Sequence, residues 1–215
     1  MKLVVFDCDG TLVDGQHMIL ESMRHACATC EVIYPGDEPV RRIVGLSLLQ
    51  AIEGIFPDLD RDRHLAIREA FVTCFQHLRQ EGRTQEPLYE GVVEILDHLL
   101  VEGYLLGIAT GKSQRGLKKT LSNHGLEKYF LTLNTADDGP GKPHPSMLLN
   151  AMRETGMDPG NTVMVGDTTY DMEMARAARV RGIGVSWGYH EDRELVSAGA
   201  SHVIHCMGEL PDLLL

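Results

Sequence analysis

The sequence predicts an α/β protein with a parallel sheet that is interrupted by an entirely helical insertion. Three observations lead to this prediction. Short apolar runs that end in small or acidic residues recur along the chain, segments of helical period separate them, and residues 16–82 contain no such run. Strands that alternate with helices are typical of a parallel sheet covered on both faces. We therefore assign residues 1–15 and 83–215 to an α/β core and residues 16–82 to a helical cap.

Four apolar runs predict strands of the core. They cover residues 3–6, 104–109, 162–165 and 182–186. Glycines expected just past helix ends follow three of the intervening segments, at Gly103, Gly125 and Gly156. The order of strands and helices favours a Rossmann-like core.

The predicted cap shows helical spacing of apolar residues, for instance at Phe71, Val72, Phe75 and Leu78. The insertion begins soon after the first strand and returns near Pro87. It should therefore lie over the carboxyl edge of the sheet, where open α/β folds bind their ligands.

Composition and charge restrict the classes of partner. The 215 residues are 43% hydrophobic and 24% charged, which is typical of a globular protein, and the net charge is −11. An acidic surface repels nucleic acids and anionic membranes, so we expect neither as a partner. The first apolar run is too short for a signal peptide, and the five cysteines suggest reduced thiols. We expect a cytoplasmic protein, monomeric or homodimeric, that acts on a small metabolite.

Acidic residues follow the first predicted strand. Asp7 and Asp9 lie two residues apart, so an extended backbone directs both side chains to one side and directs Cys8 into the core. Gly10 permits a tight turn that brings backbone amides close to a bound anion. This pair alone is also typical of a surface turn.

Complementary groups follow the other strands. Thr110 offers a hydroxyl and Gly111 an open amide, Lys142 lies in a Gly-Pro-Gly-Lys-Pro loop, and Asp167 and Asp171 are one helical turn apart. Singly, these residues suit a helix cap, a solvated lysine and an acidic helix start. Together, at the ends of one sheet, they indicate a binding site.

Four carboxylates in one pocket predict a cation. At a spacing of about 4 Å, each pair repels by ~4 kcal/mol at an effective dielectric of 20. Oxygen ligands, without clustered histidines or thiolates, favour Mg2+ over Zn2+.

The segments Asp7-x-Asp9-Gly-Thr, Thr110-Gly, Lys142-Pro and Gly-Asp167-x-x-x-Asp171 resemble the four motifs of haloacid dehalogenase superfamily phosphatases. The resemblance spans nearly the whole chain. The order, the spacing and the helical cap are most similar to bacterial phosphoglycolate phosphatases. Two departures are Gly15, where serine is common, and Ser47, where proline is common.

The resemblance implies a role for each matching residue. Asp7 would be the nucleophile that forms an aspartyl phosphate, and Asp9 the general acid and base. Thr110 and Lys142 would position and neutralise the phosphoryl oxygens. The implied Mg2+ ligands are Asp7, the Asp9 carbonyl group and Asp167, with Asp171 either a further ligand or the residue that orients a metal-bound water.

The predicted substrate is a small phosphorylated metabolite, with 2-phosphoglycolate as the first choice. We assign substrate binding to Gly10, Gly111, Lys112 and Arg42, the last because the cap has a basic pair at Arg41 and Arg42. A solvated position for these arginines is the alternative.

Other functions fit parts of the sequence. A phosphomutase of the β-phosphoglucomutase type or an inorganic pyrophosphatase would share the four motifs, and a non-catalytic phosphate-binding protein would need fewer of them. A dehalogenase needs no Asp9, because a halide leaves without a proton.

Three local patterns have alternative interpretations. Gly184-Val-Ser186-Trp-Gly188 matches a serine-hydrolase nucleophile elbow, but only 27 residues follow it to supply an acid and a histidine. Cys27 and Cys30 are interpreted as packed thiols rather than a metal or redox site. His144 and His190 lie near the site loops, where a minor substrate role is the alternative to a structural one.

Overall fold

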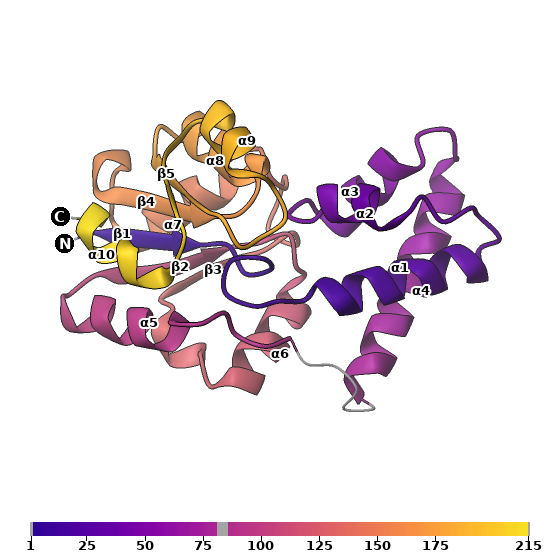
Figure 1. Cartoon of the computed structure of the whole chain (residues 1–215), viewed down its shortest axis with the longest axis horizontal. Helices are drawn as coiled ribbons and strands as arrows, with labels where there is room; N and C mark the ends of the chain where they lie inside the picture. The colour runs from indigo at the N-terminus through magenta and orange to yellow at the C-terminus, as the bar shows by residue number, and fades with distance from the viewer. Residues whose placement is uncertain (1, 81–85, 215) are drawn as a thin grey trace.

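The computed structural model describes residues 2–80 and 86–214 and shows two lobes (Figure 1). The larger lobe contains a six-stranded sheet in the order β3-β2-β1-β4-β5-β6, and every neighbouring pair is parallel. Its strands are β1 (Leu3–Phe6), β2 (Leu105–Ala109), β3 (Thr132–Asn134), β4 (Thr162–Gly166), β5 (Arg181–Val185) and β6 (Ala200–Ile204). This is the strand order of a Rossmann-like sheet, so the predicted fold class is confirmed.

The central strand β1 shows why the sheet is buried on both faces. Its four residues are fully buried. Val4 and Phe6 pack into the apolar cluster on one face, whereas Leu3 and Val5 pack into the cluster on the other. A short run of consecutive apolar residues therefore forms a strand here, because both of its faces are covered.

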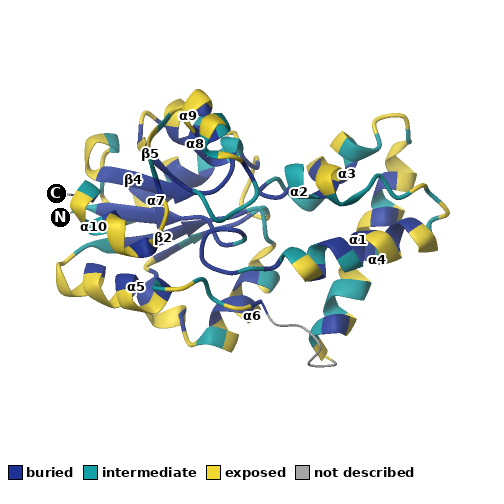
Figure 2. Ribbon diagram, in the orientation of Figure 1, coloured by how far each residue is buried: buried dark blue, intermediate teal, exposed yellow. Residues whose placement is uncertain are grey.

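Helices cover both faces of the sheet, and their outer surfaces are exposed (Figure 2). One face packs against α5 (Val92–Val101), α6 (Gln114–His124) and α10 (Leu210–Leu214). The other packs against α7 (Ser146–Thr155), α8 (Thr169–Ala177) and α9 (Asp192–Ala198). Short 3-10 turns occupy Glu127–Tyr129, Pro159–Asn161 and Met207–Glu209. Gly125 and Gly156 end α6 and α7 in the left-handed conformation, as predicted.

The smaller lobe is helical and has an apolar core of its own. It comprises α1 (Gln16–Thr29), α2 (Asp37–Arg42), α3 (Leu48–Ile55) and α4 (Arg61–Gln80). Met23, Ile52 and Ile67 are fully buried within this cluster. The boundary predicted between residues 82 and 83 lies outside the described residues. We call α1 to α4 the cap.

The two segments that connect the cap to the core lie side by side. Val13 and Leu88 form an antiparallel bridge, and the Asp14 amide donates to the Pro87 carbonyl oxygen at 2.8 Å. The Tyr89 amide donates to the Leu12 carbonyl oxygen at 3.0 Å. The two chain connections of the cap are therefore adjacent, and the cap lies beyond the carboxyl ends of the strands (Figure 1).

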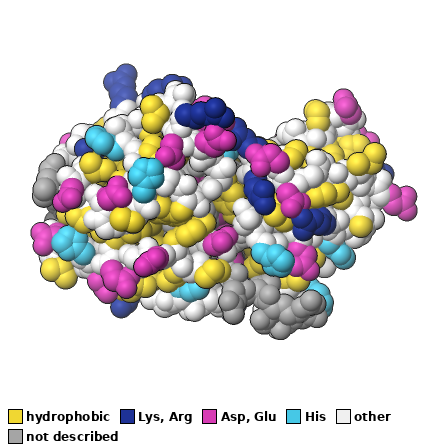
Figure 3. All heavy atoms as spheres, in the orientation of Figure 1, with side chains coloured by type: hydrophobic (Ala, Val, Ile, Leu, Met, Phe, Trp, Pro, Cys, Tyr) yellow, Lys and Arg dark blue, Asp and Glu magenta, His cyan; other side chains and the backbone are white. Residues whose placement is uncertain are grey.

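The surface charge and the hydropathy of the helices bear on where the protein can act. Acidic side chains are scattered over both lobes on the face shown in Figure 3. Within residues 2–80 and 86–214, none of the helices combines the length and hydropathy that crossing a bilayer needs.

Candidate active site

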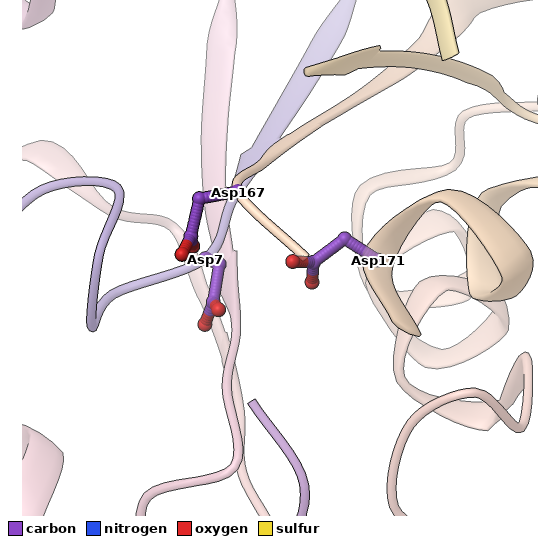
Figure 4. A group of neighbouring side chains, drawn as sticks. All are labelled: Asp7, Asp167 and Asp171. Atoms are coloured by element: carbon purple, nitrogen blue, oxygen red, sulfur yellow. The ribbon is translucent and has the colours of Figure 1, made fainter. Parts of the chain in front are cut away.

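Three carboxylates meet at the carboxyl edge of the sheet. Asp7 follows β1, Asp167 follows β4, and Asp171 lies in the first turn of α8 (Figure 4). One ligand atom from each lies within 4.8 Å of the others, and all three side chains are buried. β1 and β4 are neighbours at the centre of the sheet, which explains how residues 160 positions apart in the sequence come together.

Lys142 is the buried counter-charge of this group. Its Nζ lies 2.8 Å from Asp7 Oδ1 and 2.7 Å from Asp171 Oδ1. Burial lowers the pKa of Lys142, but the two carboxylates outweigh it and hold the pKa above its ordinary value. Burial raises the pKa of Asp7 to about 7, although Lys142 opposes the shift. One ammonium group faces three carboxylates, so ionisation of all three leaves a local charge of −2.

Backbone and hydroxyl donors fix the carboxylates. Asp167 accepts hydrogen bonds from Thr11 Oγ1 at 2.9 Å and from the Tyr189 amide at 3.0 Å. Thr168 caps α8 and donates from its hydroxyl to Asp171 Oδ2 at 2.7 Å. Sequence reasoning missed these supports, although Thr168-x-x-Asp171 is a recognisable capping pattern.

Gly10 is required by the close packing around Asp167. Its φ is +80°, and a Cβ at this position would overlap Asp167 Oδ2. The turn after β1 therefore needs glycine, both for its backbone conformation and for space.

The carboxylate group fits a divalent hard cation. The donors are all oxygen, and Asp7 Oδ2 has no hydrogen-bond partner among the described residues, whereas Asp7 Oδ1 accepts from the Cys8 amide at 2.6 Å. At the observed spacing, each pair of ionised carboxylates repels by about 3–4 kcal/mol at an effective dielectric of 20. A bound divalent cation would offset this repulsion, and oxygen donors favour Mg2+.

The carboxylate of Asp9 lies apart from the other three. Its Oδ1 is 2.8 Å from Lys112 Nζ, which is also 3.2 Å from Glu86 Oε1. Arg79, near the end of α4 in the cap, lies 2.6 Å from the other oxygen of Glu86. The structure thus brings together three of the four predicted carboxylates. The fourth belongs to an ion-pair chain, missed by sequence reasoning, that joins the core to the cap.

Thr110 and Gly111 lie where the cap approaches the core. Thr110 is buried, and its hydroxyl accepts from the Lys112 amide at 3.2 Å. A Cβ at Gly111 would overlap the carbonyl oxygen of Leu46, a cap residue. The absence of a side chain at Gly111 therefore allows the cap to reach the sheet.

Arg42 lies away from the position assigned to it in the sequence analysis. Its two terminal nitrogens each lie 2.6 Å from a Glu194 oxygen on α9, and Arg42 is not among the described residues that line the cavity between the lobes. Its carbonyl oxygen accepts from Tyr170 at 3.1 Å and lies 3.2 Å from His190 Nε2. Arg42 thus joins cap to core outside the cavity.

The two histidines near the site have backbone partners. His190 Nδ1 accepts from the Thr169 amide at 3.1 Å, and His144 Nδ1 accepts from the Ser146 amide at 3.2 Å. These contacts support the structural interpretation of both side chains.

Ser186 has neighbours suggestive of a serine hydrolase, but their geometry is unsuitable. His205 Nδ1 lies 2.9 Å from Ser186 Oγ and 3.9 Å from Asp192 Oδ2. A catalytic triad needs the serine and the acid on opposite ring nitrogens, whereas here both face Nδ1. Ser186 is therefore unsuited to act as a triad nucleophile.

Cys27 and Cys30 are free thiols in the structure. Cys27 is buried, and burial raises its pKa to about 11. A protonated, packed thiol agrees with the interpretation made from the sequence.

A cavity of about 970 Å³ separates the cap from the core. Asp7, Asp9 and Thr110 line its core side, together with Gly111 and Lys112. Three of the four predicted catalytic residues therefore face a space large enough for an organic ligand, and the fourth, Lys142, lies buried behind Asp7.

Known proteins share both the sequence pattern and the fold. The sequence model of the haloacid dehalogenase-like hydrolase family matches residues 4–185. The chain is 35% identical to "Probable phosphatase IndB" of Dickeya dadantii, with 97% of this chain and 91% of that protein covered. It is 32% identical to pyrophosphatase PpaX of Bacillus pumilus, and the match covers 98% of this chain and 94% of that protein. It is 30% identical to a phosphoglycolate phosphatase of Mesorhizobium japonicum, and the match covers 94% of this chain and 89% of that protein.

A solved structure of a hydrolase from Pseudomonas syringae superposes with a TM-score of 0.88 at 23% identity, covering 99% of this chain and 98% of that one. At this identity, the likeness shows the shared fold.

Proposed function

Because the chain belongs to the haloacid dehalogenase-like hydrolases, we propose that it is a Mg2+-dependent phosphomonoester hydrolase with Asp7 as its nucleophile. The observation that carries this proposal is the state of the Asp7 carboxylate. One of its oxygens is held by Lys142 and the Cys8 amide, while the other is buried without a partner among the described residues. A carboxylate fixed in this way is positioned to attack an electrophile that enters the cavity.

Asp7, Asp167 and Asp171 would hold the Mg2+ ion, together with the Asp9 carbonyl oxygen. When bound, the ion supplies positive charge that balances the carboxylates and the phosphoryl oxygens. The excess negative charge around Lys142 supports this assignment.

The chain's own residues account for the steps of the reaction. Asp7 attacks phosphorus, the bond from phosphorus to the ester oxygen breaks, and the phosphoryl group is transferred to Asp7. Asp9, in its protonated form, donates its proton to the leaving alcohol. Asp9 then takes a proton from the water that attacks the aspartyl phosphate, which releases phosphate and restores both side chains.

Lys142 and Thr110 act on the phosphoryl group. The ammonium group of Lys142 lies beside Asp7 and neutralises charge that develops on the phosphoryl oxygens. Thr110 and Gly111 line the cavity, as Asp7 does, and the Thr110 hydroxyl and the Gly111 amide would position these oxygens.

The names of the relatives supply two candidate substrates, 2-phosphoglycolate and inorganic pyrophosphate. Either would be a small phosphorylated metabolite of the cytoplasm. Arg42, one of the two arginines expected to select a phosphorylated acid, pairs with Glu194 and is not among the residues that line the cavity, so its position does not favour 2-phosphoglycolate. A phosphomutase would use the same residues, but would transfer the phosphoryl group between sugar hydroxyls rather than to water.

Hydrolysis of p-nitrophenyl phosphate with Mg2+ tests the proposal, with phosphate release as the readout. We expect turnover that EDTA abolishes and added Mg2+ restores. Asp7→Asn should abolish turnover, whereas Asp58→Asn, at an exposed cap position, should not. Acid-quenched enzyme should carry protein-bound phosphate that hydroxylamine releases. Full activity in excess EDTA, or in Asp7→Asn, would refute the mechanism.

A further inference from the structure

The cap side of the cavity is largely apolar. The residues of α4 that line it share one helix face, with Phe71, Val72 and Phe75 in the middle of this face, Arg68 at one end, and Gln76, Arg79 and Gln80 at the other. Ile19 and Met23 of α1 and Leu48 of α3 extend this surface. We call this surface the apolar wall, and it lines the same cavity as Asp7.

One side of the cavity is basic. Arg115, Lys118 and Lys119 line it from a single face of α6, and all three are exposed to solvent. No carboxylate of residues 2–80 or 86–214 lies within ion-pair distance of them, although Glu127 and Asp137 also line the cavity. In a chain with a net charge of −11, a basic surface at this place favours an anionic ligand.

The cavity is also large for the candidate substrates. Its volume of about 970 Å³ is near the top of the range of ~300–1,000 Å³ for sites that hold drug-sized ligands. A two-carbon acid or pyrophosphate would leave the apolar wall in contact with water. Contact between this wall and an apolar ligand would gain binding energy in proportion to the area covered.

We propose that the substrate is a phosphomonoester with an elongated, mainly apolar body and a second anionic group. Its phosphate lies against Asp7, its body covers the apolar wall around Val72 and Phe75, and its second anion faces the basic side of α6. This inference rests on the proposed function and names the substrate class of the same site.

A series of straight-chain alkyl phosphates tests the apolar wall. kcat/KM should rise by roughly ten- to a hundredfold from ethyl to hexyl phosphate, because each buried methylene contributes up to about a fourfold gain. Hexyl phosphate should also exceed 2-phosphoglycolate and pyrophosphate. Val72→Thr should reduce the gain with chain length, whereas Val196→Thr, an exposed valine of α9, should leave it unchanged.

A terminal carboxylate tests the basic side. 6-Carboxyhexyl phosphate should exceed heptyl phosphate by roughly two- to fivefold, the size expected for an exposed ion pair, and this advantage should shrink in 0.5 M NaCl. Arg115→Gln combined with Lys118→Gln should abolish the advantage. Arg153→Gln, an exposed arginine of α7, is the matched control and should retain it.

The outcomes separate the two proposals. Hydrolysis that is flat along the alkyl series, or is fastest for 2-phosphoglycolate or pyrophosphate, would overturn the substrate class and leave the hydrolase standing. If no compound is hydrolysed with Mg2+, the hydrolase assignment falls, and calorimetric titration with the same alkyl phosphates decides the substrate class. Affinity that rises with chain length would then support it, and affinity independent of length would overturn it.

Discussion

Replacement of Gly111 by alanine should separate the cap from the core without touching a catalytic group. The new methyl group would overlap the Leu46 carbonyl oxygen, and would lie 2.8 Å from the Gly45 carbonyl oxygen, where ordinary contact begins at 3.4 Å. The cap must therefore move by at least about 0.6 Å. The Gly111 amide is retained, so only the distance between the lobes changes.

The expected result is a loss of kcat/KM for p-nitrophenyl phosphate of roughly tenfold, and up to a hundredfold. A displacement of about 1 Å in a substrate-positioning element has an effect of this size. The measurement is steady-state hydrolysis with Mg2+, accompanied by thermal unfolding to show that the variant is folded.

Gly54→Ala provides the matched control. Gly54 lies in α3 of the cap, and a Cβ there would meet nothing within 4 Å. Alanine in a helix stabilises by up to ~1 kcal/mol relative to glycine, so this variant should be active and at least as stable as the unmodified protein. If folded Gly111→Ala keeps its activity within twofold, the closed position of the cap has no role in catalysis and the reasoning fails.

Three further substitutions test individual side chains. Asp9→Asn should slow hydrolysis of an alkyl phosphate more than hydrolysis of p-nitrophenyl phosphate, because nitrophenolate leaves without a proton; equal losses in kcat would argue for a structural Asp9. Ser186→Ala should keep most of the phosphatase activity, since the Ser186 hydroxyl lies against His205 and Ser186 does not line the cavity; a loss of activity would reopen the serine-hydrolase interpretation. Arg42 lowers the pKa of Glu194 to about 2, from an ordinary value of 4.5. The stability from this pair is therefore complete above about pH 4.5 and is lost as the pH falls towards 2. In urea, the free energy of unfolding of Glu194→Gln should be lower than that of the unmodified protein at pH 6. This difference should shrink between pH 4.5 and pH 2, and a difference that stays constant would show that the charge of Glu194 is not responsible.

Strands could be predicted from the sequence where a run of apolar residues marked them. β1, β2, β4 and β5 are interior strands whose runs of apolar residues stop at glycine or polar residues, and all four exist. The edge strands β3 and β6 were missed. β3 has three residues, and β6 has exposed polar residues in its sequence Ala-Ser-His-Val-Ile, because an edge strand packs less completely. Short or half-exposed strands leave little pattern to detect.

Contacts between the lobes could not be predicted. Arg42 and Glu194 are 152 residues apart, and nothing near either residue indicates the other. Glu86 and Arg79 likewise become partners of Lys112 only once the cap has docked. Asp7, Lys142, Asp167 and Asp171 could be grouped beforehand, because a parallel sheet gathers the ends of its strands at one edge.

The adjacent chain connections of the cap make it an exchangeable module. Both ends of the insertion leave the core at the Val13 and Leu88 bridge, where Asp14 and Pro87 are already hydrogen-bonded. A loop of any length can be grafted between such adjacent ends at little entropic cost, because the closure entropy grows only with the logarithm of loop length. The catalytic sheet can therefore be combined with a different lid, or with a short turn alone, while Asp7, Lys142 and the other carboxylates keep their places. Changes in substrate preference can then arise by replacement of one segment rather than by remodelling of the chemistry.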